Sequence, residues 1–387
     1  MSAPGASGII DYAYIQIYNK YLSYSDDTAV INKVSASFTG ANQVLDPITG
    51  RHENVALQRL RDSSHLYMGK YSNGKMLLKQ LKDDDGTKYL DGTTAIMTGA
   101  DGEHWLRINE PFYIKRYSGY DSGTRITYAI AVGGQPNSSW KQIIGTDDLL
   151  AVHEAVAANT NDNTIGVLHS RSGSQSTANI TRNNFKAKAR NKSTGHTLVT
   201  WEWHCVMQLL FYAWYGRTNA QAQCGAGSQS STRILGTKDS LGMTDTTSDN
   251  GNDDNTKFWG IENWWGDKYE FVDNVDIEDR VWTVTDVKTG STRTAGTGAS
   301  SSNWISKMLL SANLDFIPVD VVSSSYKTNY YTDYYNQDTG SRILLRSYYS
   351  NEDNGGVSCI ITRLDSSYKG IACGTRLAYH GDIEIIS

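Results

Sequence analysis

The sequence predicts an α+β fold in which two helices pack on antiparallel strands joined by long loops, preceded by a small β-rich N-terminal module. The chain of 387 residues has 35 glycines, only five prolines and 11% aromatic residues, a composition typical of tight turns and β-structure. Short runs of alternating or aromatic residues recur along it. The clearest helical signals lie at 181–192 and 201–215.

The N-terminal module is expected to comprise residues 1–95. Alternating and aromatic residues at 12–24 fit a strand, residues 54–60 fit a short helix, and the run of aspartates before Gly86 fits a turn. No pattern in this segment indicates chemistry. Its position makes attachment to a larger assembly the expected role.

The second domain is expected to span residues 96–387. It begins with two short strands interrupted by Pro111, and a further strand at 126–132 ends at a Gly-Gly pair. These strands lead into the two helices.

The ends of the first helix can be located from its flanking residues. Thr181 is the expected N-cap, because Ile180 and Phe185 are spaced to form a hydrophobic staple around it. The helix should run to about Lys192 and stop before Gly195.

The second helix is expected to start after Thr200 and to end at Gly216, a residue type that commonly terminates helices. Apolar residues recur along it at intervals of three and four, which makes one continuous stripe typical of a core-facing helix. The stripe comprises Trp203, Val206, Met207, Leu210, Phe211 and Trp214.

Residues 226–256 are predicted to be a loop rich in Ser, Thr, Asn and Gly. The loop also carries Asp245, Asp249, Asp253 and Asp254. Calcium binding is therefore an alternative to a solvated loop, although the spacing of an EF-hand is absent.

The aromatic segment 258–273 follows, with the sequence FWGIENWWGDKYEFVD. Its aromatic residues are expected in the core, with Glu262 and Asn263 completing hydrogen bonds of buried backbone groups. Residues 283–288 and 290–294 are predicted to form a hairpin.

Charge and hydropathy argue against several functional classes. The net charge is −5 and the pI is about 5.9, with basic residues spread along the chain, so no nucleic-acid partner is expected. The longest apolar run, 209–215, is too short to cross a bilayer, so no membrane insertion is expected. The first eight residues lack the basic and hydrophobic regions of a secretory signal, which predicts synthesis in a cytoplasm.

The cysteine and histidine patterns predict no metal site, no cofactor and no enzyme. His204 adjoins Cys205 and His380 lies seven residues after Cys373, but neither pair completes a ligand cluster. The eight histidines are scattered, and no Ser-His-Asp set or carboxylate pair can be selected. The cysteines have no CxxC spacing and are expected to be free, buried thiols. They are Cys205, Cys224, Cys359 and Cys373.

The last third of the chain is rich in tyrosine. Residues 326–379 hold nine of the 24 tyrosines, and thirteen of the 24 residues at 346–369 are Ser, Thr, Tyr, Asn or Asp. Tyrosine offers a large contact area with few rotatable bonds, and small polar residues give adaptable hydrogen bonds, as in evolved recognition surfaces. The exposed face of an ordinary antiparallel sheet has a similar composition. Composition alone leaves both interpretations open.

The order of several motifs resembles that of C-type-lectin-fold proteins. The motifs are Lys188-Ala189-Arg190, Gln208-Leu209-Leu210, Tyr215-Gly216, the aromatic segment 258–273, Gly340-Ser341-Arg342, Asn354-Gly355-Gly356 and Gly374-Thr375-Arg376-Leu377. This set is similar to the branch of the fold that holds formylglycine-generating-enzyme-like domains and the variable proteins of diversity-generating retroelements, among them a phage tropism determinant. The resemblance covers about residues 100–387 and implies a C-type-lectin-like domain there.

The resemblance also implies a function. The chain would be a bacteriophage virion structural protein with a receptor-binding domain for host adhesion, on a tail fibre or another external part of the particle. Its partners would be a bacterial surface protein or glycan and other virion proteins, in a homo-oligomer for which the family favours a trimer. The presumed variable face lies at 326–370. The implied ligand-binding residues are Tyr348, Tyr349, Asn351, Asp353, Asn354, Arg363, Asp365, Ser367 and Tyr368.

Two other functions remain as alternatives. A capsid or tail protein that used the lectin-like domain for assembly only would bury its tyrosine-rich face against another virion chain. The oxidase branch of the same fold uses a cysteine pair a few residues apart. Cys359 and Cys373 are fourteen residues apart and lie in apolar sequence, so an oxidase is less expected.

Overall fold

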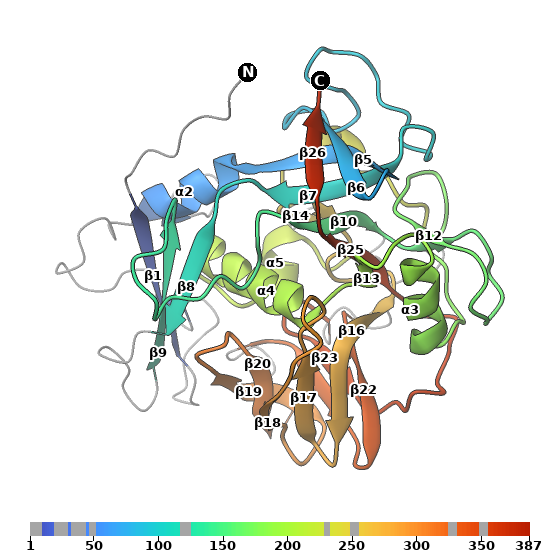
Figure 1. Cartoon of the computed structure of the whole chain (residues 1–387). Helices are drawn as coiled ribbons and strands as arrows, with labels where there is room; N and C mark the ends of the chain where they lie inside the picture. The colour runs from blue at the N-terminus through green and yellow to red at the C-terminus, as the bar shows by residue number, and fades with distance from the viewer. Residues whose placement is uncertain are drawn as a thin grey trace.

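The computed structural model describes residues 10–18, 30–31, 44–45, 52–116, 125–227, 233–247, 255–323, 331–347 and 355–387. Within these ranges the fold is α+β, as predicted, and consists mostly of sheet. Three sheets surround one long central helix (Figure 1). The described helices are α2 (Val55–Asp62), α3 (Arg182–Arg190), α4 (Trp201–Tyr215), α5 (Ala220–Cys224) and the 3₁₀ helix η2 (Asp239–Leu241).

A seven-stranded sheet crosses the upper part of Figure 1. Its spatial order is β13 (His196–Leu198), β25 (Arg376–His380), β10 (Asp148–Glu154), β7 (Glu103–Ile108), β5 (Ser64–Ser72), β6 (Lys75–Gln80) and β26 (Ile383–Ile386). Neighbouring strands are antiparallel except β6 and β26.

A nine-stranded sheet forms the lower part of the molecule. Its spatial order is β18 (Thr292–Thr297), β17 (Val281–Thr285), β16 (Tyr269–Glu278), β22 (Ser341–Arg346), β23 (Ile360–Thr362), β21 (Tyr334–Gln337), β19 (Asn303–Leu310) and β20 (Phe316–Val322), with β24 (Cys373–Gly374) beside β16. Strands β17 and β18 pair antiparallel, which confirms the predicted hairpin.

Smaller sheets complete the fold. A four-stranded sheet has the order β2 (Val30–Ile31), β1 (Asp11–Tyr18), β9 (Arg125–Val132) and β8 (Phe112–Arg116). The two-stranded pairs are β3 (Val44–Leu45) with β4 (His52–Glu53), β11 (Val156–Ala157) with β12 (Leu168–His169), and β14 (Lys257–Phe258) with β15 (Ile261–Glu262). The strands expected on either side of Pro111 are β7 and β8.

Strand pairs connect the two sides of residue 95. β1 pairs with β9 along its whole length, and β5 pairs with β7 from Ser64 opposite Ile108 to Gly69 opposite Glu103. Residues before position 95 therefore share two sheets with later residues. The division of the chain into two domains at this position stays a prediction.

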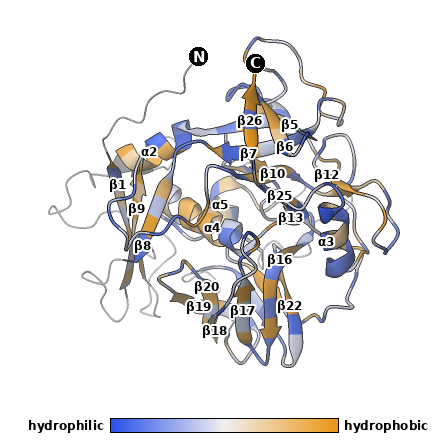
Figure 2. Cartoon of the chain, in the orientation of Figure 1, coloured by the Kyte–Doolittle hydropathy of each residue, from blue (hydrophilic) through white to orange (hydrophobic). Residues whose placement is uncertain are grey.

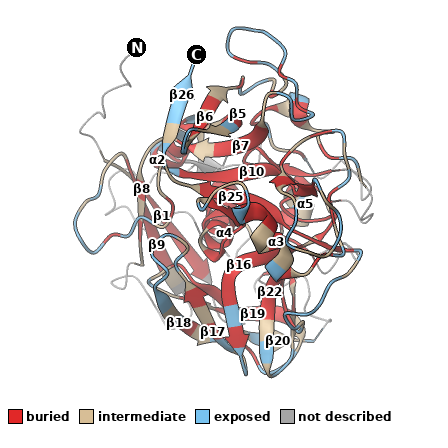
Figure 3. Cartoon of the chain, turned by 45° about the vertical axis from the view of Figure 1, so that its right-hand side comes forward, coloured by how far each residue is buried: buried red, intermediate tan, exposed pale blue. Residues whose placement is uncertain are grey.

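Helix α4 has the ends that the sequence predicts. Thr200 caps it by accepting a hydrogen bond from the Trp203 amide, and Gly216 ends it at a left-handed φ of 66°. The predicted stripe is buried, but so is every other residue of the helix except Glu202. Figure 3 shows α4 enclosed by the surrounding elements. Its 15 residues are too few to cross a membrane, and no other described helix is long and apolar enough to do so.

Helices α3 and α2 lie at the periphery (Figure 1). α3 is largely hydrophilic (Figure 2) and buries one side, including Phe185 at its predicted staple position. It ends at Arg190, two residues earlier than expected, and Thr181 donates hydrogen bonds to Asp162 instead of capping the helix with its side chain. α2 coincides with the short helix expected at 54–60, and the Asn54 side chain caps it.

Candidate functional site

Three charged side chains from β16, β22 and β25 form a buried ionic network. Glu270 on β16 forms ion pairs with two arginines. Its Oε2 lies 2.6 Å from Nη1 of Arg346 on β22, and its Oε1 lies 2.9 Å from Nη2 of Arg376 on β25. All three side chains are fully buried. The Arg346 guanidinium carbon also lies 3.5 Å from the ring centroid of Trp264, a cation–π contact. Burial lowers the pKa of Arg346 to about 10, and the Glu270 carboxylate acts in the opposite direction.

Arg376 connects this network to two backbone segments. Its Nη1 donates to the carbonyl oxygens of Ala151 at 3.0 Å and Val152 at 2.5 Å, and its Nη2 donates to Glu262 at 2.7 Å and Asn263 at 3.0 Å. The planar guanidinium satisfies all of these acceptors at once, which a lysine could not do. The Gly-Thr-Arg-Leu motif is therefore a buried framework element.

An exposed loop follows β23 on the outside of this framework. The predicted ligand-binding residues Arg363, Asp365, Ser367 and Tyr368 all lie on it and are all exposed. Asp365 Oδ1 accepts hydrogen bonds from the Ser367 amide at 2.8 Å and hydroxyl at 2.6 Å, so these two residues form an Asx-turn. The Ser367 hydrogen bonds lower the pKa of Asp365. Arg363 and Tyr368 project from a turn of defined shape.

Two contacts hold the far end of this loop. Lys369 Nζ lies 3.1 Å from Asp162 Oδ2, and the Gly370 carbonyl accepts a hydrogen bond of 2.9 Å from the Asn179 amide. Beside them, Ile371 is 77% exposed and Tyr368 is 38% exposed. The loop thus presents an aromatic and an aliphatic side chain to solvent on an anchored backbone.

The remaining predicted binding residues lie outside the described residues; they are Tyr348, Tyr349, Asn351, Asp353 and Asn354. Within the presumed variable face at 326–370, Tyr331 and Tyr335 are fully buried in the main hydrophobic core. Part of the tyrosine richness of this region therefore belongs to the core and not to a surface.

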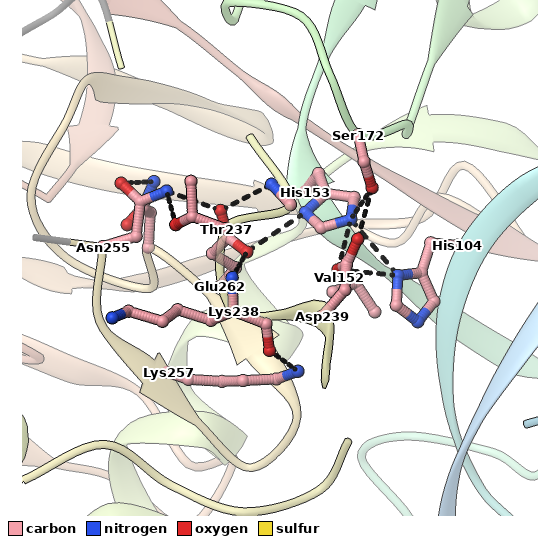
Figure 4. A network of polar contacts seen from close by, with 12 residues as sticks. His104, Val152, His153, Ser172, Thr237, Lys238, Asp239, Asn255, Lys257 and Glu262 are labelled. Carbon is pink, nitrogen blue, oxygen red and sulfur yellow. Dashed lines mark hydrogen bonds and ion pairs between the residues drawn. The ribbon is translucent and has the colours of Figure 1, made fainter. Parts of the chain in front are cut away.

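A second cluster of polar residues lies inside the molecule, between β7, β10 and η2. His104 Nδ1 is 3.2 Å from His153 Nε2, and Asp239 Oδ1 is 3.1 Å from His153 Nε2 and 3.6 Å from His104 Nδ1. Figure 4 shows the three side chains facing one another next to Ser172. Both histidines are fully buried and Asp239 is 4% exposed.

The electrostatics of this cluster follow from burial and proximity. Burial lowers the pKa of His104 to about 4, which favours the neutral imidazole with a free lone pair. Burial raises the pKa of Asp239, but the His153 and His104 imidazoles outweigh it and lower the pKa overall. Asp239 is therefore an ionised carboxylate facing two imidazoles.

Glu262 lies on the other side of His153. Its Oε2 is 3.8 Å from His153 Nδ1, while its Oε1 accepts hydrogen bonds from the Gly236 amide at 2.8 Å and the Asn255 side chain at 2.7 Å. Glu262 also accepts from the Lys238 amide, so the prediction that it completes buried backbone hydrogen bonds is confirmed. The same prediction is wrong for Asn263, whose side chain donates to the Asn255 side chain at 3.3 Å. The aromatic residues Trp259, Trp264 and Trp265 are fully buried, as expected.

Glu154, which directly follows His153, forms a buried acidic pair with Asp267. Burial and the neighbouring Asp267 raise the pKa of Glu154 well above its ordinary value. Ser176 donates a hydrogen bond of 3.1 Å to Asp267 Oδ2. Both carboxyl groups are fully buried, and the raised pKa favours the protonated form of Glu154, which lowers the cost of burying it.

The four cysteines are free and buried, as predicted. Burial raises the pKa of the Cys359 thiol well above its ordinary value and that of Cys373 to about 12. Thiol chemistry requires an accessible thiolate, so these environments do not favour the oxidase alternative. The expectation that the chain is not an enzyme stays a prediction.

A scan against protein-family models finds no match to the chain, and a search of curated proteins finds no significant match.

The sequence reasoning did not find the histidine–aspartate cluster. Extending the pairing of Leu150 with Leu106 would place Val152, not His153, across from His104. β10 has a register shift between Leu150 and Glu154, and such an irregularity changes the face that a side chain occupies. One sequence feature could have indicated this cluster: apolar residues lie on both sides of His153 and Glu154, and a polar residue inside a buried strand needs a partner.

Proposed function

We propose that the chain is a virion structural protein of a bacteriophage, and that a C-type-lectin-like domain within it binds a ligand on the bacterial surface. The observation that carries the proposal is the contrast between the buried Glu270–Arg346–Arg376 network and the exposed loop at 363–371. The motif resemblance supplies the fold family and the virion setting.

The loop has the properties of a recognition surface. Its turn is fixed by Asp365, and its end is held by Asp162 and Asn179, so little conformational entropy is lost when it binds. Tyr368 and Ile371 offer aromatic and aliphatic contact area, and Arg363 adds a positive charge at the rim. Modest affinity at one site would be raised by several copies on one particle, which the expected homo-oligomer would supply.

The proposal is tested by competition for adsorption. Excess purified protein is incubated with host bacteria before the phage particles are added, and adsorption is counted. The wild-type protein should block adsorption, whereas a Tyr368→Ala, Ile371→Ser variant should bind at least about thirtyfold more weakly, because the loss of a single anchor usually costs about 2 kcal/mol. Its melting temperature should stay close to that of the wild type, because both side chains are exposed.

The matched control is Leu90→Ser. Leu90 is 60% exposed in the segment after β6, so Leu90→Ser removes a similar apolar side chain from a surface that the proposal does not use. Two results together would favour the assembly role instead. The wild-type protein would fail to compete for adsorption, and Tyr368 would be shielded from chemical labelling on intact particles.

A further inference from the structure

The buried cluster of His104, His153 and Asp239 has the dimensions of a metal site. The donor atoms form a triangle with edges of 3.2, 3.1 and 3.6 Å. In a tetrahedral zinc site with bonds of about 2.0–2.1 Å, neighbouring ligand atoms lie about 3.3–3.4 Å apart. The three donor atoms are therefore spaced as the ligands of one such ion would be.

Hydrogen bonds alone do not satisfy the triangle. Asp239 Oδ1 is 3.1 Å from His153 Nε2, but among the described residues no N–H or O–H group points at it with hydrogen-bond geometry. A buried carboxylate oxygen without a donor is costly. One cation that accepts a lone pair from each of the three atoms would satisfy all of them together.

Neighbouring groups hold the ligands in place. The Ser172 hydroxyl donates to Asp239 Oδ2 at 2.5 Å, which directs Oδ1 towards the histidines, and its oxygen lies 3.3 Å from His153 Nε2. Ser170 bonds to the backbone of both histidines, through the His104 carbonyl at 3.0 Å and the His153 amide at 3.2 Å. Each ligand is therefore positioned by a contact other than those within the triangle.

The Glu262 side chain lies on the outer side of the His153 ring, although its distance from Nδ1 is longer than a hydrogen bond. It faces His153 Nδ1 at 3.8 Å, while Nε2 faces the triangle. A carboxylate that accepts a hydrogen bond from this nitrogen would fix the tautomer and raise the basicity of the ligand nitrogen, and a small approach of Glu262 would form that bond. Figure 4 shows Glu262 and Asp239 on opposite sides of the His153 ring.

We propose that His104, His153 and Asp239 bind a divalent transition-metal ion, for which zinc is the best match, at a structural site. Two imidazoles and one carboxylate favour zinc over calcium or magnesium, which prefer all-oxygen ligands. Burial of the three ligands favours a structural ion over a catalytic one, because a substrate would need an open coordination position. Ser172 or a water molecule would complete the coordination. The ion would connect the loop that carries η2 to strands β7 and β10 of the seven-stranded sheet.

The test is refolding with and without metal. Because the site is buried, the full chain is unfolded in denaturant with a chelator and refolded with Zn²⁺, free metal is removed, and bound zinc is measured. The wild type should retain about one zinc per chain. His153→Gln and Asp239→Asn should retain at least tenfold less. The control is His196→Gln, which removes a buried histidine outside the cluster and should retain as much as the wild type.

A second measurement on the wild type keeps the test decisive if the variants do not fold. Refolding with Co²⁺ should give the visible absorption bands of a tetrahedral nitrogen–oxygen site, and zinc should raise the melting temperature relative to chelator. A folded wild type that holds no zinc and shows no such bands would overturn the proposal. So would a folded Asp239→Asn variant with the full zinc content and an unchanged cobalt spectrum.

Discussion

The buried network should make Arg376→Ala one of the most damaging single substitutions in the chain. Arg376 is fully buried, pairs with Glu270 and donates to the backbone carbonyls of four residues. Its removal leaves Glu270 with one arginine in place of two and deprives those carbonyls of a donor. The neighbouring side chains are also buried, so the network is shielded from bulk solvent.

The expected magnitude follows from these contacts. Removing one partner of a buried ion pair costs about 3–5 kcal/mol, and each buried polar group left without a partner costs about 1–3 kcal/mol more. Relaxation around the cavity recovers part of this sum. We therefore expect a loss of about 4 kcal/mol or more in the free energy of unfolding, which is a large share of the roughly 5–15 kcal/mol typical of a folded protein.

The assay is denaturant unfolding followed by tryptophan fluorescence, to which buried Trp264, in contact with the network, should contribute. Arg376→Lys keeps the charge but lacks the planar fork, so its loss should be intermediate. Arg363→Ala is the matched control, because Arg363 is exposed and its removal should change stability by no more than about 0.5 kcal/mol. A loss below about 1 kcal/mol for Arg376→Ala would refute the reasoning.

Two further predictions concern stability. Leu210 is 1% exposed in α4, so Leu210→Ala should cost about 2–5 kcal/mol by opening a cavity, and a loss below about 1 kcal/mol in denaturant melts would contradict its core position. Burial lowers the pKa of His196 from 6.5 to about 3, so between these values the unfolded chain binds one more proton than the folded chain. Stability should therefore fall as the pH falls through this range, by up to about 1.4 kcal/mol per pH unit from this residue. His196→Gln should reduce that slope, and equal slopes for the two proteins would contradict the assignment.

The parts of the fold that the sequence predicts well are those whose signals are local. Capping residues and glycine geometry define both ends of α4, and Pro111 separates β7 from β8. The complete burial of α4 was not predictable from its stripe, because the faces that lack a regular apolar pattern carry His204 and Gln208, which are buried all the same. Tertiary packing of three sheets around the helix decides their environment.

The buried polar site depends on non-local contacts. His104 and His153 lie on strands that become neighbours only when the seven-stranded sheet forms, and His153 lies within the register shift in the pairing of β10 with β25. Asp239 belongs to a segment whose Ser, Thr and Gly content resembles a solvated loop, yet it is buried. Likewise, composition cannot separate Tyr335 in the core from Tyr368 at the surface, because both lie in equally polar sequence.

The two proposals assign different tasks to different parts of one chain. The Glu270–Arg346–Arg376 network and the proposed metal site both use side chains that are buried and held by several partners. The side-chain contacts of the loop at 363–371 include the local bond of Asp365 with Ser367 and the surface ion pair of Lys369 with Asp162. Exposed side chains such as Arg363 and Tyr368 can therefore change without opening a core cavity. The proposed recognition role depends on this separation, since most substitutions in a packed interior destabilise the fold, whereas substitutions on an anchored exposed loop would mainly alter what it binds.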